Sequence, residues 1–382
     1  MVRKQVVPAL FAAAMAVSLA ACRAPSGLRE TIQTGEAESP AELEQDETGE
    51  ETTSGEADTG EAEDAGTDAK KAVKIGMVVD TAEEEAFFRQ SLQAGLSRAA
   101  QELGVQVQCL EAGTAAEYDF RLNSLIEEDY DLIIGTGNEM AAAVRKAAQA
   151  CPNIQFAAIG NASNADLDNV TSIVFDQSQV YYLAGVVAGM TTDGGKTGLI
   201  FSSAGENSDL LGYSYCAGVL DANAEAEIFQ QEAALSQVSQ EEYNSAVEMI
   251  DQGADVIFCA APGSLSEVLE KCREKGDWII GADPSQCDPS REGVLAVAVQ
   301  NVEKGIFALA QDCLDQQLQG GVLVYDLGNE GVDLLLSEDN LPKEVEKAAA
   351  EIKEKIRSGE ITLPGSRQEF EAAYGDVYQL GE

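Results

Sequence analysis

Residues 131–144 read DLIIGTGNEMAAAV, and this stretch decides the fold class. The apolar run from Asp131 to Ile134 suits a short buried strand, and Gly135-Thr136-Gly137 then turns the chain into a segment with helical periodicity. The same succession of short apolar run, turn and helix recurs along the chain from residue 73. It is typical of a parallel sheet covered by helices, so the sequence predicts an α/β fold.

The first group of expected elements ends at residue 175. Its strands are Val73 to Val79, Val105 to Leu110, Asp131 to Ile134, Ile154 to Ile159 and Val170 to Phe175. A helix from Glu83 to Leu103 fits between the first two strands, because Leu92, Leu96 and Ala99 can share a face before Gly104 stops it. This group predicts one doubly wound parallel-sheet lobe.

A second group repeats the pattern. Its strands are Thr197 to Ser202, Glu227 to Phe229, Asp255 to Cys259, Trp278 to Gly281 and Val294 to Val299, with helices from Gln240 to Gln252 and from Leu265 to Lys275. Beyond these we expect a helix from Val302 to Leu318, strands from Val322 to Tyr325 and Gly331 to Leu336, and a helix from Pro342 to Arg357.

The expected division is into two lobes joined by a multi-strand hinge. Residues 73–192 with about 301–320 form one lobe, and residues 193–300 with about 321–382 form the other. Parallel sheets bind ligands beyond the carboxyl ends of their strands. Two such lobes predict a cleft that closes over a solute.

The first residues predict export. Arg3 and Lys4 precede an apolar run that ends in Leu19-Ala20-Ala21-Cys22, which resembles a bacterial lipobox, so residues 1–22 are expected to be a lipoprotein signal with Cys22 lipidated. An ordinary secretory signal with a chance cysteine is the alternative. The acidic residues 23–72 are expected to be a disordered tether, with an interaction tail as the alternative.

Composition excludes several classes of function. The net charge of −43 opposes nucleic acid as a partner, and the absence of histidine removes the usual general base and imidazole metal sites. We expect no cofactor, no metal and no catalysis. The cysteines after Cys22 form no Cys-x-x-Cys pair, which favours buried free thiols over a disulfide framework.

Two carboxylates stand out because each follows an expected strand. Asp80 comes after Val73 to Val79 and Asp283 after Trp278 to Gly281, where a parallel sheet presents side chains to a ligand. Capping of the following helix is an equally good interpretation of each. Gly135-Thr136-Gly137 lacks the third glycine of a dinucleotide fingerprint, so we interpret it as a tight turn that places Asn138 near the cleft.

Several phrases together resemble the BMP family, the basic membrane lipoproteins that serve as substrate-binding components of ABC transporters for purine nucleosides. They are DLIIGTGNEMAAAV, NVTSIVFDQSQVYYLAGVVAGM, DQGADVIFCAAPG, IIGADPSQ and IRSGEITLP, within about residues 73–364. The resemblance implies a type I periplasmic-binding-protein-like fold on the extracytoplasmic face of the cell membrane. It also implies an ABC permease and an ATPase as partners.

For the site, the resemblance implies a nucleoside held between the lobes. Phe88 would stack on the base, Asp80 and Asp283 would contact polar groups, and Gly263 would allow a close backbone approach. The chain departs from the family at positions that would also face the ligand: Arg89 replaces an asparagine, Gln300 a lysine, Gly160 and Asn161 stand where an aspartate is expected, and Ser236 and Gln237 where an aromatic is expected.

We therefore expect a solute-binding lipoprotein for a nucleoside-like ligand. A sugar or signalling-molecule receptor of the same fold, in which Arg89 would favour an anionic group, is the first alternative. A regulatory lipoprotein that has lost transport is the second.

Overall fold

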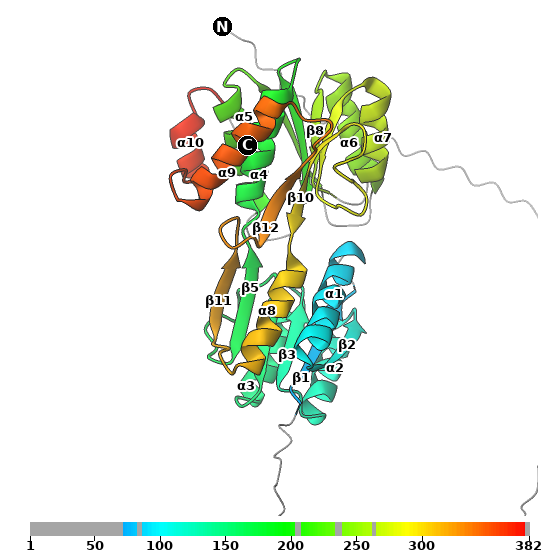
Figure 1. The fold of residues 1–382 in the computed structure, drawn as a ribbon, viewed down its shortest axis with the longest axis vertical. Helices are drawn as coiled ribbons and strands as arrows, with labels where there is room; N and C mark the ends of the chain where they lie inside the picture. Colours follow the sequence, from blue (N-terminus) through cyan, green and yellow to red (C-terminus); the bar gives the residue numbers. More distant parts are fainter. Residues whose placement is uncertain (1–71, 82–85, 203–207, 234–238, 262–264, 379–382) are drawn as a thin grey trace, which may run out of the picture. The chain divides into compact units, whose positions relative to one another are not determined.

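The computed structural model of the protein describes residues 72–81, 86–202, 208–233, 239–261 and 265–378 (Figure 1). Residues 1–71, with Cys22 and nearly all of the expected tether, lie outside these ranges, as do Gly263, Ser236 and Gln237. The described chain forms two six-stranded sheets, each with helices on both faces. The predicted architecture of two doubly wound α/β lobes is confirmed.

The first sheet has the strand order β11-β5-β4-β3-β1-β2, and all its pairings are parallel. Its strands are β1 (Lys74–Asp80), β2 (Gln106–Ala112), β3 (Leu132–Thr136), β4 (Gln155–Ile159), β5 (Val170–Phe175) and β11 (Gly321–Tyr325). Its helices are α1 (Ala86–Leu103), α2 (Ala115–Glu127), α3 (Ala141–Ala150) and α8 (Val302–Leu314). These elements make up the first lobe.

Side-chain alternation along β1 explains why both faces of this sheet are covered. Ile75 and Met77 belong to the core cluster that includes residues of α1 and α8, whereas Val78 belongs to the cluster that includes α2 and α3. Because a strand presents successive side chains to opposite faces, an almost continuous apolar run needs helices on both sides.

The second sheet has the order β12-β10-β9-β8-β6-β7, in which only β12 is antiparallel to its neighbour. Its strands are β6 (Lys196–Ser202), β7 (Glu227–Ala233), β8 (Val256–Cys259), β9 (Trp278–Gly281), β10 (Val294–Gln300) and β12 (Val332–Leu336). Its helices are α4 (Ser178–Thr191), α5 (Ser208–Ala222), α6 (Ser239–Asp251), α7 (Leu265–Lys275), α9 (Lys343–Arg357) and α10 (Arg367–Tyr374). These elements make up the second lobe.

Two elements lie in the lobe opposite to the one that the sequence analysis expected. Helix α4 packs on α5 and on the second sheet, although it precedes residue 192, and β11 pairs with β5 of the first sheet. Glycines explain the close contact of α4 with α5: a Cβ on Gly185 would lie 2.2 Å from the carbonyl oxygen of Tyr215, and one on Gly218 2.0 Å from that of Tyr182. The two backbones therefore touch.

One helix end and one additional helix also differ from the expectation. Helix α8 stops at Leu314 rather than at residue 318, because Gln316 adopts the left-handed conformation with φ 58° and Gln317 N–H donates to the Asp312 carbonyl over 2.8 Å. Helix α10 was not expected. Its cap is Ser366, whose hydroxyl accepts from the backbone N–H of Glu369 over 3.3 Å.

The cysteines match the sequence interpretation within the described residues. Cys109, Cys151, Cys216, Cys259, Cys272, Cys287 and Cys313 are all free thiols. Cys216, Cys259, Cys272 and Cys287 are buried, where each packs as a small apolar side chain.

Three segments connect the lobes, and each leaves a sheet at the carboxyl end of a strand. They are residues 176–177 after β5, residue 301 after β10 and residues 326–331 after β11. Hydrogen bonds hold them together: Asn301 N–H donates to the Gly331 carbonyl over 2.8 Å, and Asp176 N–H to the carbonyl of Tyr325 at the end of β11 over 2.8 Å. The multi-strand hinge thus joins the two sheets at the carboxyl ends of their strands.

Candidate functional site

The first lobe has a topological switch point at the carboxyl ends of β1 and β3. The chain passes from β1 outward to β2, then returns to β3 and continues in the other direction through β4 and β5. Open parallel sheets bind ligands at such a point. Asp80 is the last residue of β1, and Asn138 follows β3, so both predicted residues lie there.

Asp80 is fixed by its neighbours. Its backbone N–H donates to the hydroxyl of Thr136 at the end of β3 over 3.1 Å, and the phenol of Tyr118 on α2 donates to its Oδ2 over 2.9 Å. The side chain is 0% exposed. Direct contact with a ligand therefore requires neighbouring side chains of the first lobe, such as Tyr118, to move.

Asn138 and Asn161 form a pair at the ends of β3 and β4. The amide of Asn161 donates to Oδ1 of Asn138 over 2.8 Å, while its own Oδ1 accepts from the backbone N–H of Ser163 over 2.8 Å. Gly160, which precedes Asn161, has φ +81°, a conformation that glycine adopts without strain. These contacts orient the two amides next to each other at the sheet edge.

A charged pair holds the loop that carries Asn161. Arg145 on α3 contacts Asp166 and also donates to Oδ1 of Asn164 over 3.4 Å. The hydrogen bonding that Arg145 donates to the Asp166 carboxylate lowers the pKa of Asp166 and raises the pKa of Arg145. Sequence analysis missed these residues and Tyr118, because each acts through a partner 19 to 38 residues away in the chain.

Phe88 and Arg89 lie in the first turns of α1. Both side chains are partly exposed, and Phe88 packs against the core cluster formed with α8. Part of its ring is thus committed to the core. The exposed remainder is what a stacking role would use.

In the second lobe, Asp283 and Gln300 lie at the carboxyl ends of the neighbouring strands β9 and β10. Asp283, just after β9, is 4% exposed, and its carboxylate accepts from the backbone N–H and hydroxyl of Ser285 and from the Gln286 amide over 2.7–2.8 Å. It therefore caps its own turn. Gln300 ends β10 opposite Val332 and is partly exposed.

The part of the chain that the structure describes contains neither a metal-binding group nor a membrane-spanning helix. No group of His, Cys, Asp or Glu side chains there is arranged to hold a metal ion. No helix among those residues has the length and apolar character needed to cross a membrane.

The doubled sheet, joined at its carboxyl ends and carrying polar side chains there, defines a two-lobed α/β protein of the type I periplasmic-binding-protein class. The family model for ABC transporter substrate-binding protein PnrA-like (Bmp) matches residues 72–367. The chain therefore belongs to this family of substrate-binding proteins, as the resemblance implied.

Individual proteins agree with the family match. The chain is 31% identical over 319 residues to the CD4+ T-cell-stimulating antigen of Listeria monocytogenes, a match that covers 78% of this chain and 89% of that protein. It is 29% identical over 302 residues to the ABC transporter nucleoside-binding protein BmpA of Lactococcus lactis subsp. cremoris, covering 72% and 84%. An ABC transporter solute-binding protein from Conexibacter woesei DSM 14684 has the same fold, with TM-score 0.65 and 20% identity over 77% of this chain and 99% of that one.

Proposed function

We propose that the protein is the receptor of an ABC importer and binds a nucleoside-like polar solute between its two lobes. The observation that carries the proposal is the position of the candidate residues. Asp80, Asn138 and Asn161 lie at the carboxyl ends of neighbouring strands in the first lobe, and Asp283 and Gln300 at those of the second, whose connections run through the same ends. The name of the Lactococcus relative supports the nucleoside class.

Each residue is assigned a role by its chemistry. The carboxylates of Asp80 and Asp283 and the amides of Asn138, Asn161 and Gln300 would bond ribose hydroxyls and base edges. Phe88 would offer a ring face to the base. Arg89 would meet an electronegative group of the ligand, and Gly263 would let the backbone approach it closely.

The proposal includes anchoring and excludes catalysis. Cys22 would carry the lipid, residues 23–72 would act as the tether, and the ligand would pass to a permease and its ATPase at the cell membrane. Binding without turnover fits a chain that contains no histidine. Mass spectrometry of the protein purified from membranes should find a diacylated Cys22 at the new amino terminus, and an unmodified cysteine there would contradict the anchoring.

A titration of the purified protein by calorimetry tests the ligand class. Adenosine, guanosine, inosine, uridine and cytidine are compared with free ribose and glucose. At least one nucleoside should bind saturably and stabilise the protein by about 2.7 kcal/mol at a hundredfold excess over its Kd. Binding of the free sugars but of none of the nucleosides would instead support the sugar receptor.

A receptor for an anionic solute is the second candidate, because Arg89 replaces the asparagine of the family at the start of α1. The corresponding nucleoside monophosphates test it. Tighter binding of a monophosphate than of its nucleoside, lost in Arg89→Gln, would favour this candidate.

A further inference from the structure

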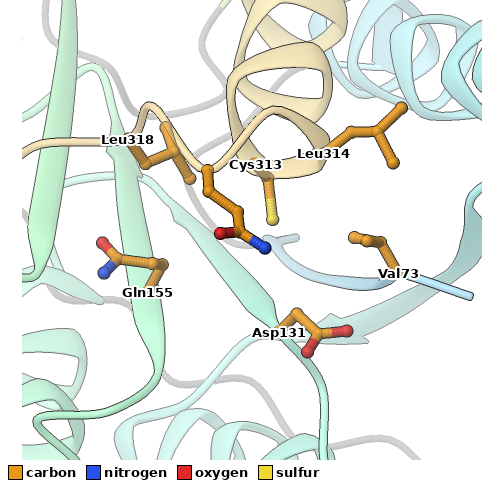
Figure 2. Close-up of a pocket in the computed structure, with 7 residues that line it drawn as sticks. Val73, Asp131, Gln155, Cys313, Leu314 and Leu318 are labelled. Atoms are coloured by element: carbon orange, nitrogen blue, oxygen red, sulfur yellow. The ribbon is translucent and has the colours of Figure 1, made fainter. Parts of the chain in front are cut away.

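A pocket of about 430 Å³ lies at the opposite edge of the first sheet from Asp80 (Figure 2). It is bounded on the sheet side by Val73 before β1, Asp131 before β3 and Gln155 at the start of β4. These positions are the amino ends of the strands, on the order of 15–20 Å from the carboxyl ends at about 3.3 Å per residue. The pocket is therefore separate from the candidate solute site.

The end of α8 forms the other side of the pocket. Cys313 and Leu314 come from its last turn, and Gln316 and Leu318 follow it. Because Gln316 takes the left-handed conformation and ends the helix, no further helical turn covers the sheet edge beneath it. Figure 2 shows the Cys313 sulfur extending from the helix end into the space between Leu318 and Val73.

Two acceptors, the Asp131 carboxylate and Oε1 of Gln155, decide which polar ligand groups fit the pocket. Among the described residues, Asp131 is the only charged one that lines the pocket. Its Oδ2 accepts from the backbone N–H of Lys74 over 2.8 Å, which fixes the carboxylate. Oε1 of Gln155 is buried and has no hydrogen-bond partner among the described residues. A buried acceptor without a donor is unfavourable, so this edge favours a ligand that brings N–H groups.

The remaining lining is apolar. Val73, Leu314 and Leu318 contribute aliphatic surface. Burial, with the nearby Asp131 carboxylate, raises the pKa of Cys313 to about 11, so its thiol stays protonated at neutral pH and adds no second negative charge. One anionic group beside an aliphatic wall suits a ligand with a cationic end and an apolar body.

We propose that this pocket binds a primary ammonium ion with a compact apolar body. Its volume lies in the range of small-molecule sites, about 300–1,000 Å³. The ammonium group would donate to Asp131 and to the amide oxygens of Gln155 and Gln316, and the body would pack on the aliphatic side chains. The Asp131 charge disfavours anions, since none of the described residues that line the pocket is basic.

The test uses the full-length protein and two matched pairs of probes. Calorimetry or ligand-detected NMR compares 2-phenylethylamine and hexylamine with the uncharged 2-phenylethanol and hexanol. We expect saturable binding of at least one amine, and binding of its alcohol weaker by about tenfold or more, because a charge-assisted hydrogen bond is lost.

Variants locate the binding. Asp131→Asn keeps an acceptor for Lys74 N–H but removes the charge, and it should weaken amine binding about tenfold or more. The matched control, Asp315→Asn, makes the same change on an exposed residue beside the pocket that does not line it, and should stay within about twofold. Asp283→Asn should leave amine binding unchanged, which separates this site from the solute site.

A pocket-narrowing variant covers the case in which Asp131→Asn does not fold. Leu318→Trp keeps every charge but places a larger side chain in the pocket, and it should weaken amine binding while the thermal unfolding transition remains. The proposal is overturned by a lack of saturable amine binding up to about 10 mM. Equal affinities of Asp131→Asn and Asp315→Asn, or full binding by folded Leu318→Trp, would also overturn it.

Discussion

The phenol of Tyr118 donates a hydrogen bond to Oδ2 of Asp80 over 2.9 Å, and both side chains are buried. Tyr118→Phe leaves a buried carboxylate oxygen short of a donor, so the free energy of unfolding should fall by about 1–3 kcal/mol, measured by urea denaturation. The control is Tyr130→Phe, which loses a bond of 2.6 Å to the neutral Gln108 amide and should cost about 0.5–1.5 kcal/mol. A smaller loss of unfolding free energy in Tyr118→Phe than in Tyr130→Phe would contradict a hydrogen bond from Tyr118 to a buried Asp80 carboxylate.

The amide pair at the ends of β3 and β4 gives a second prediction. In Asn161→Asp, a carboxylate oxygen replaces the nitrogen that donates to Oδ1 of Asn138, so two acceptors face each other. Nucleoside affinity should fall by about tenfold or more. The control is Asn223→Asp, because there the side-chain oxygen only accepts from Glu225 N–H over 3.2 Å and an aspartate can do the same. If Asn161→Asp bound the nucleoside with unchanged affinity, Asn138 and Asn161 would not belong to the solute site.

The linker between β11 and β12 contains a glycine that no other residue can replace without a shift. A Cβ on Gly331 would lie 2.3 Å from the Cβ of Tyr325 and 2.7 Å from its Cα, so Gly331→Ala should destabilise the protein by about 1–3 kcal/mol. In the control, Gly328→Ala, the new Cβ would be 3.1 Å from a carboxylate oxygen of Asp326. That variant should lose less than about 1 kcal/mol in thermal unfolding followed by circular dichroism. Equal losses of stability in the two variants would show that the contact with Tyr325 does not determine the need for glycine at position 331.

Buried thiols predict a loss of stability at alkaline pH. Burial raises the pKa of Cys216 and of Cys287 from 9.0 to about 12. The buried protonated thiols contribute fully to the free energy of unfolding at a pH below the thiol pKa of the unfolded chain. This contribution is lost as the pH rises toward the thiol pKa of the folded protein, because the thiols of the unfolded chain ionise first. Under reducing conditions the urea midpoint should therefore fall between about pH 8.5 and 10. The fall should be less steep in the double variant Cys216→Ala, Cys287→Ala, and an identical slope in both proteins would contradict this origin.

Much of the fold followed from local pattern. The apolar runs and the glycine turns located the described strands and gave the two-sheet organisation, because the period of side-chain burial is a local property. The lobe to which a helix belongs is not local. Helix α4 is buried on nearly all sides, so its sequence has no polar face to indicate which sheet it covers, and β11 is separated by 145 residues from its partner β5.

A local signal existed for only one of the two differences in the helices. Ser366 and Glu369 have the spacing of a helix start, which would have predicted α10. The end of α8 had no such signal, since a glutamine in the left-handed conformation is uncommon and the nearest glycines, Gly320 and Gly321, come later. The expected end at residue 318 was therefore too late.

For the candidate site too, the sequence predicted some features and not others. The position of Asp80 and Asp283 after strands could be inferred from sequence, whereas the partners that fix them could not. Asp283 bonds within its own turn, but Asp80 depends on Tyr118, 38 residues away on α2. The Asn138 contact with Asn161 likewise joins loops 23 residues apart. Sequence proximity says nothing about such contacts.

A repeated motif in the second lobe provides the most direct test of the solute site. Asp283-Pro284-Ser285 and Asp288-Pro289-Ser290 form the same turn, in which the aspartate accepts from the backbone N–H and the hydroxyl of the serine over 2.7–2.8 Å. Only Asp283 is buried at the carboxyl end of a strand, whereas Asp288 is exposed.

The decisive measurement is therefore the Kd of the bound nucleoside for Asp283→Asn and for Asp288→Asn, each by calorimetric titration. A ligand held at the carboxyl ends of the strands predicts about a tenfold or greater loss of affinity in Asp283→Asn and a change within about twofold in Asp288→Asn. Equal affinities of the two variants, with both proteins folded, would contradict the placement of the ligand at this edge.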